Sequence, residues 1–167
     1  LEPIYGNDVA LQAFARILAR FPGARLSVAG SGPEAAALAE LAQSLGIAAQ
    51  VRFSGRLDRE QMAALYRDAH LMLNASRVDN MPNAVLEALA SGVPVISTRA
   101  GGIPFMVKDG HTAMLVAVDD AEAMAAAAIE VLENHDLRAR LVAAGLVEVQ
   151  RYQWSRVRDA LLATYTE

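Results

Sequence analysis

Two carboxylates, Asp79 and Glu87, stand eight residues apart in a stretch whose other residues predict a loop followed by a helix. Pro82 suits the first turn of a helix, where its missing N–H costs nothing, and Asn80 is a suitable N-cap just before it. The free amides of residues Met81 to Ala84 should then point out of the helix start. That end carries a partial positive charge, so it favours a phosphate or a sugar hydroxyl. Glu87 lies about one turn into this helix.

These residues belong to a chain in which apolar strand patterns alternate with amphipathic helix patterns. Asp58 with Gln61, and Asp119 with Glu122, form capping-box signatures that mark two of the helix starts. No hairpin signal joins consecutive strands, so the alternation predicts a parallel sheet with helices on both faces. The expected strands are residues 25–29, 50–54, 70–74, 93–98 and 112–116, and the expected helices are 7–20, 33–45, 58–69, one from Pro82, a short one within 101–107, 119–133, one from Asp136, and 152–165.

Composition excludes several classes of function. The chain has 167 residues, 54% of them hydrophobic, but contains no apolar run near the ~20 residues that a membrane span needs. Its formal net charge of −4 argues against non-specific nucleic-acid binding. It has no cysteine, which excludes disulfides, thiolate metal sites and thiol nucleophiles. We expect one cytoplasmic domain, residues 1–167, that acts on small molecules and does not bind nucleic acid.

Other candidate residues follow the predicted strands. Gly30 and Gly32 lie between a strand and a helix, where they either turn the chain tightly or approach a ligand. Arg56 and Arg99 also follow strands, and each is either a ligand contact or a solvated surface arginine. The three histidines match no metal-ligand spacing, so we expect no metal in this domain.

The stretch from Ser76 to Pro104, SRVDNMPNAVLEALASGVPVISTRAGGIP, resembles the donor-binding core of retaining, nucleotide-sugar-dependent glycosyltransferases of the GT-B fold. That family carries the pattern E-G-x-P-N-x-x-x-E-A-x-A-x-G-x-P-V-I-x-T-x-x-G-G-x-x-E. Asp79 stands at its first Glu, while Asn80 replaces its Gly and Phe105 its last Glu. The matching positions are Pro82, Asn83, Glu87, Ala88, Ala90, Gly92, Pro94, Val95, Ile96, Thr98, Gly101 and Gly102.

The resemblance implies roles for several residues. Glu87 is implied to accept hydrogen bonds from both ribose hydroxyls of the donor, and Asp79 to contact the transferred sugar. The helix start at residues 81–84 and the turn from Ala100 to Gly102 are implied to offer backbone amides to the diphosphate. Tyr5 occupies the place of a family lysine that neutralises the diphosphate, so another cation is needed. The candidates are an arginine just before Leu1, Arg77 and Arg99, of which we favour Arg99.

The family resemblance implies a Rossmann-like parallel sheet, equivalent to the C-terminal half of a GT-B glycosyltransferase. The expected reaction moves a sugar from a nucleoside-diphosphate sugar, a substrate and not a cofactor, to an acceptor hydroxyl with retention. The acceptor domain, and any membrane contact, would belong to an N-terminal part absent from this chain. The isolated chain should therefore be inactive. Two alternatives stay open: a non-catalytic nucleotide-sugar-binding or partner-binding module, and a sugar-nucleotide epimerase.

Overall fold

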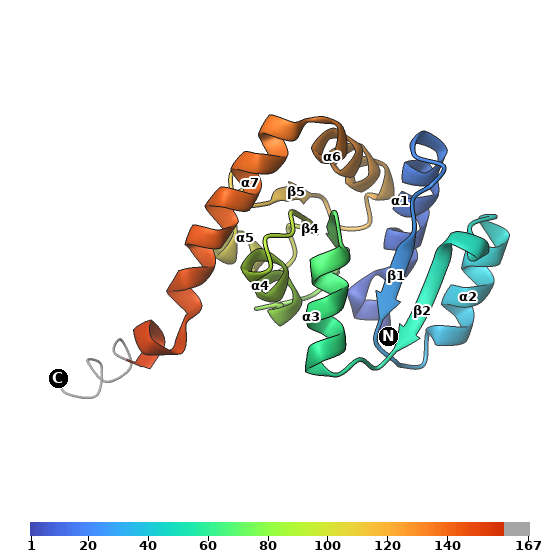
Figure 1. Cartoon of the computed structure of the whole chain (residues 1–167). Coiled ribbons are helices and arrows are strands. Elements are labelled where there is room, and N and C mark those ends of the chain that lie inside the picture. Colours follow the sequence, from blue (N-terminus) through green and yellow to red (C-terminus); the bar gives the residue numbers. More distant parts are fainter. Residues whose placement is uncertain (159–167) are drawn as a thin grey trace.

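The computed structural model of this protein describes residues 1–158, in which strands and helices alternate along the chain (Figure 1). Each strand is parallel to its hydrogen-bonded neighbours, which confirms the predicted parallel α/β class. The strands of the described part are β1 (Leu26–Ala29), β2 (Val51–Gly55), β3 (Met72–Asn74), β4 (Val95–Thr98) and β5 (Met114–Val116).

The strands form two sheets where the sequence predicted one. One sheet pairs β1 with β2, and the other has the order β3-β4-β5. β3 is only three residues long, and soon after it the Arg77 amide donates to the Ile4 carbonyl at 2.7 Å. The backbone that leaves β3 is therefore hydrogen-bonded to the N-terminal segment and does not extend a ladder with β1.

The helices follow the strands as predicted. Asp58 caps its helix in a capping box with Gln61, with both reciprocal hydrogen bonds present. Residues 154–158 are also helical, so the expected last helix begins two residues later than predicted, after the 3₁₀ turn that ends at Tyr152, and its expected part beyond residue 158 lies outside the described residues. The helices are α1 (Asn7–Arg20), α2 (Ala35–Ser44), α3 (Arg59–Asp68), α4 (Asn83–Ala90), α5 (Ile103–Met106), α6 (Ala121–Glu133) and α7 (His135–Glu148), with short 3₁₀ turns at η1 (Pro3–Tyr5), η2 (Ala48–Gln50) and η3 (Val149–Tyr152).

Two predicted helix starts are corrected by one or two residues. Asp120, not Asp119, caps α6, because its carboxylate accepts the Ala123 amide at 2.8 Å. Asp119 has a left-handed backbone (φ 61°), and its carboxylate is paired with Arg77 instead. The cap of α7 is Asn134, so this helix begins before the expected Asp136.

The central strand β4 divides the core into two apolar clusters. Val95 and Ile96 are both fully buried, yet Val95 belongs to a cluster with α4, and Ile96 to a cluster with α1 and α6. Neighbouring side chains on a strand point to opposite faces, so helices cover both sides of this sheet. Figure 1 shows α6 lying over α1 on one side and α4 packed beneath β4 on the other.

Candidate functional site

The loop between β3 and α4 holds the first carboxylate, Asp79, in a half-buried position. Its Oδ1 accepts the Met81 amide at 3.2 Å, which closes a local turn just before the helix. The N-cap of α4 is Pro82, with an extended backbone, and no side chain caps the helix. The expected cap at Asn80 is therefore corrected, because the turn around Asp79 delays the helix by two residues.

The Gly101–Gly102 turn holds this loop in place. A Cβ atom on Gly101 would lie 2.2 Å from the Asp79 carbonyl oxygen, and one on Gly102 would lie 2.0 Å from that of Asn80. The Gly102 amide donates to the Asp79 carbonyl at 2.9 Å. Only glycine allows this approach, so the two glycines serve to pack the loop. The Gly102 amide, expected to face the diphosphate, is instead hydrogen-bonded within the protein.

A hollow of about 350 Å³ opens beside Asp79 at the start of α4. It brings together most of the residues that the sequence singled out around the helix start. Within residues 1–158, the amides of Asn83 and Ala84 have no hydrogen-bond acceptor, so they are available to a ligand. The lining residues are Tyr5, Asn74, Ser76, Asp79, Met81, Pro82, Asn83 and Ala84.

Asn74 and Ser76, which the sequence analysis did not select, belong to this hollow through a chain of hydrogen bonds. The Ser76 hydroxyl donates to Asn74 Oδ1 at 2.9 Å, and Asn74 Nδ2 donates to the Ser97 hydroxyl at 2.9 Å. Asn74 and Ser97 are register partners in β3 and β4. Polar residues at the ends of apolar strands were the available signal, since ligands of parallel sheets gather at those ends.

A second hollow, of about 510 Å³, lies between α3 and α4 and contains Glu87. Glu87 is exposed, and its Oε2 accepts a hydrogen bond from the Tyr66 hydroxyl at 3.3 Å. Asp79 and Glu87 thus face separate hollows with no lining residue in common. The lining residues of the Glu87 hollow are Leu57, Asp58, Arg59, Met62, Ala63, Tyr66, Glu87, Ala90 and Ser91.

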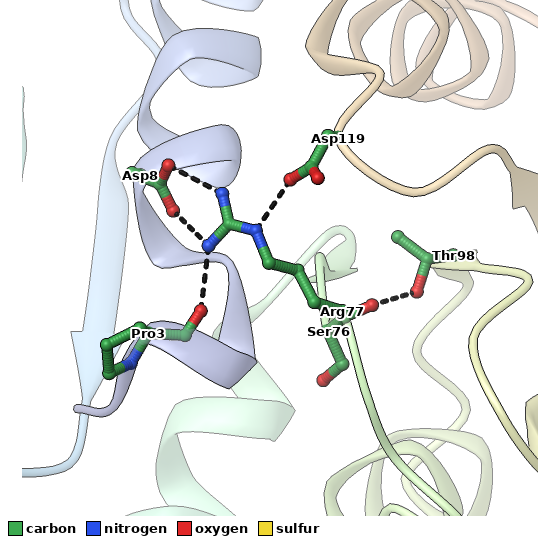
Figure 2. Close-up of polar contacts among 6 residues, drawn as sticks. All are labelled: Pro3, Asp8, Ser76, Arg77, Thr98 and Asp119. Carbon is green, nitrogen blue, oxygen red and sulfur yellow. Dashed lines mark hydrogen bonds and ion pairs between the residues drawn. The ribbon is translucent and has the colours of Figure 1, made fainter.

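Arg77, two residues before Asp79, joins three segments that are distant in the sequence (Figure 2). Its Nη1 and Nη2 atoms donate to the Asp8 carboxylate at 3.0 and 2.7 Å, and its Nε donates to Asp119 at 2.6 Å. Nη1 also donates to the Pro3 carbonyl at 2.7 Å. The guanidinium is therefore occupied inside the protein and ties the loop that carries Asp79 to η1 and α1.

The Arg77 ion pairs shift the pKa values of their members. The hydrogen bond from Arg77 lowers the pKa of the Asp8 carboxyl below its ordinary value, although partial burial opposes this. The same contact, with Asp119 in support, raises the pKa of Arg77. In the Glu87 hollow, burial first and the neighbouring Glu87 second raise the pKa of Tyr66, so the Tyr66 hydroxyl remains a donor at neutral pH.

The remaining candidates lie outside both hollows. Arg99 forms an ion pair with Asp109 at 2.5 Å, and Arg56 is exposed next to Leu57. A Cβ on Gly32 would lie 2.1 Å from the Leu1 nitrogen, so this glycine allows the N-terminal segment to cross the loop. Gly30 donates its amide to the Gly55 carbonyl at 2.7 Å. The structure thus gives Gly32 a role in that crossing, while Gly30 has a positive φ of 118° in the turn after β1.

Among residues 1–158, no three or more histidine or acidic side chains gather in a way that could hold a metal ion. No helix in this part of the chain has the length and apolar character required to cross a membrane.

The parallel sheets, the helices on both faces and the hollows beyond the strand ends define a Rossmann-like α/β domain. The sequence model of the family described as glycosyl transferases group 1 matches residues 1–146, so the chain belongs to this family. Its fold is that of the C-terminal domain of GT-B glycosyltransferases.

The relatives that match this chain over nearly its whole length are longer proteins. It is 35% identical over 166 residues to a phosphatidyl-myo-inositol mannosyltransferase of Mycolicibacterium smegmatis, covering 98% of this chain and 42% of the relative. It is 34% identical over 172 residues to a D-inositol 3-phosphate glycosyltransferase of Mycobacterium avium, covering 99% of this chain and 39% of the relative. The chain therefore spans about two fifths of the relatives that it matches.

Solved structures share the fold. HepE from Anabaena, in complex with UDP-glucose, matches with a TM-score of 0.90 at 20% identity, over 99% of this chain and 46% of HepE. The C-terminal domain of the group 1 glycosyl transferase LpcC from Francisella tularensis matches with a TM-score of 0.83 at 23% identity, over 92% of this chain and 83% of that domain. The second match shows the same fold in an isolated C-terminal domain.

Proposed function

We propose that this chain is the donor-binding domain of a glycosyltransferase that moves a sugar from a nucleoside-diphosphate sugar to an acceptor hydroxyl with retention of configuration. The observation that carries the proposal is the pair of hollows beside α4, one lined by Asp79 and the other by Glu87. An N-terminal part of the same protein would supply the acceptor site, and the cytoplasm is the proposed location. Family membership and the UDP-glucose complex of HepE support this assignment.

In the proposed arrangement, the donor lies across the start of α4. The nucleoside occupies the Glu87 hollow, where a carboxylate can accept hydrogen bonds from two ribose hydroxyls. The sugar occupies the hollow beside Asp79, and the diphosphate lies between them. The free amides of Asn83 and Ala84, at the positive end of the helix, would stabilise the departing diphosphate.

A departing diphosphate needs a cation near the Asp79 hollow, and Arg59, the arginine among the lining residues, belongs to the Glu87 hollow. None of the described residues that line the Asp79 hollow is a lysine or an arginine, and Tyr5, 46% exposed, has no charge to offer. Arg77 is held by two carboxylates, and Arg99 would have to leave Asp109 to reach a ligand. An arginine just upstream of Leu1 is the remaining candidate from the sequence, and Arg99 stays the alternative.

A second candidate function is a non-catalytic nucleotide-sugar-binding module. Two observations favour it: the uncharged Tyr5 in the sugar hollow, and Phe105, which is 87% exposed where the family pattern has a glutamate. Such a module would bind the donor in the same two hollows without turning it over.

The experiment that tests the proposal is a calorimetric screen of the full-length protein against UDP-, GDP- and ADP-sugars, followed by NMR of the glycoside formed with the donor that binds. A transferase gives a product with the anomeric configuration of the donor. Donor binding without any product, across a broad acceptor panel, supports the binding module. If the protein binds none of the three donor classes, both functions are contradicted.

A further inference from the structure

Tyr66 places a buried hydroxyl directly behind Glu87. The residue lies on α3 and is 8% exposed, with its ring in the apolar cluster that also contains Val85 and Ala88 of α4. Within residues 1–158, the acceptors near its hydroxyl are Glu87 Oε2 at 3.3 Å and the Ala84 carbonyl at 3.2 Å. A buried hydroxyl needs an acceptor, and both acceptors of the single Tyr66 proton belong to α4.

The contact restrains a carboxylate that is otherwise free. Glu87 is exposed, and within the described residues its Oε1 has no partner and its Oε2 has Tyr66 alone. A glutamate side chain in solvent samples several rotamers, and fixing one of them before a ligand arrives reduces the cost of binding. Tyr66 and Glu87 both line the same hollow, so the restrained carboxylate faces the ligand space.

We propose that Tyr66 is a positioning residue, whose hydroxyl orients Glu87 so that its carboxylate can accept both ribose hydroxyls of the donor nucleotide. This inference rests on the proposed function, because it assigns the nucleoside to the Glu87 hollow. Tyr66 holds the carboxylate from α3, and the backbone of α4 sets where the Glu87 side chain begins. The helices on either side of the hollow, α3 and α4, therefore both orient the Glu87 side chain.

The test uses the full-length protein and whichever of UDP, GDP and ADP binds it most tightly. Tyr66→Phe keeps the ring and removes the hydroxyl, and we expect it to weaken that nucleotide about 3- to 10-fold, as the loss of one hydrogen bond does. The 2′,3′-dideoxy form of the same nucleotide should bind equally well to both proteins, since it lacks the hydroxyls that Glu87 would bind. Adding Tyr66→Phe to Glu87→Gln should cause no further loss.

Matched controls separate this role from a structural one. Tyr152→Phe makes the same chemical change at a described residue that packs against the same cluster without lining the hollow, and it should leave nucleotide affinity unchanged. Tyr66→Phe should melt within about 2 °C of the wild type, because its ring still fills the core.

The results for Tyr66→Phe and Glu87→Gln separate the positioning role from the donor-site assignment. If Glu87→Gln weakens the nucleotide and Tyr66→Phe does not, the positioning role is wrong and the donor site stands. If Tyr66→Phe weakens the nucleotide and its dideoxy form equally, the hydroxyl does not act through ribose, and the inference also fails. If Glu87→Gln is silent, the nucleoside assignment itself is overturned.

Discussion

Asp79 and Glu87 are close in sequence but differ in surroundings. Asp79 is half-buried, holds the Met81 amide and faces the hollow with the free helix amides. Glu87 is exposed, contacts Tyr66 and faces the other hollow. Two carboxylates in different hollows can contact different parts of one ligand, and their removal should therefore affect different kinetic steps.

We expect Glu87→Gln and Asp79→Asn to separate in this way. Glu87→Gln should weaken nucleotide binding by about 1.5–3 kcal/mol, because charged hydrogen bonds to ribose become neutral ones. Asp79→Asn keeps an oxygen for the Met81 amide, but should lower kcat about tenfold or more by removing a charged contact to the sugar. Calorimetry and steady-state kinetics on the full-length protein measure the two effects, and identical profiles for both variants would contradict the separation.

At the scale of elements, the segment after β3 is organised by Arg77. The guanidinium joins η1, α1 and the turn before α6, and the Thr98 hydroxyl of β4 donates to the Ser76 carbonyl next to it at 2.5 Å (Figure 2). These contacts fix the start of the loop, and the Gly101–Gly102 turn fixes its end. The position of Asp79 therefore depends on both attachments.

Replacing Arg77 should destabilise the protein more than replacing another surface arginine. Arg77→Lys keeps the charge but loses the two-pronged contact with Asp8, and we expect a loss of about 1–2 kcal/mol in the free energy of unfolding. The matched control, Arg99→Lys, changes a more exposed single-contact pair with Asp109 and should cost less than about 0.5 kcal/mol. Urea denaturation measures both, and equal losses would argue against a special role for Arg77.

The same cluster predicts a pH dependence. Asp8 has a pKa lowered from its ordinary 3.8 when the protein is folded, so its contribution to stability is complete above that value. The contribution is lost as the pH falls from 3.8 through the lowered pKa. Asp8→Asn should therefore be less stable than the wild type near neutral pH, and the difference should shrink below pH 3.8. Denaturation curves across pH 2–7 test this, and a difference that stays constant would exclude the Asp8 carboxylate as its source.

At the scale of the whole molecule, the two sheets and two apolar clusters form one wall of the proposed donor site. The clusters meet on opposite faces of β4. The chain spans 42% of its mannosyltransferase relative, and the Asp79 hollow is bordered by exposed apolar side chains such as Met81, which is 52% exposed. An exposed apolar border of this kind supports the proposed wall, which an N-terminal part would cover.

We expect the isolated chain of 167 residues to fold but not to transfer sugar. It should unfold in one cooperative transition, because both clusters pack on the same strand, β4. It should bind nucleoside diphosphates weakly without a charge from the proposed N-terminal part. Differential scanning calorimetry and a radiolabelled transfer assay check the two statements. Robust turnover by this chain alone would refute the two-walled site.

The amino-acid sequence alone determined the alternation of strands and helices along the chain, the parallel α/β class, the capping box at Asp58 and the placement of Asp79 and Glu87 around one helix start. These features follow from local periodicity and from residues within a few positions of each other, so a linear pattern contains them. Only the tertiary structure decided that the two carboxylates face different hollows, that Gly101 and Gly102 serve the Asp79 loop, and that Arg77 is bound by Asp8 and Asp119. The partners of Arg77 lie 69 and 42 residues away, and contacts at that separation are set by how the helices and sheets pack, which no local pattern records.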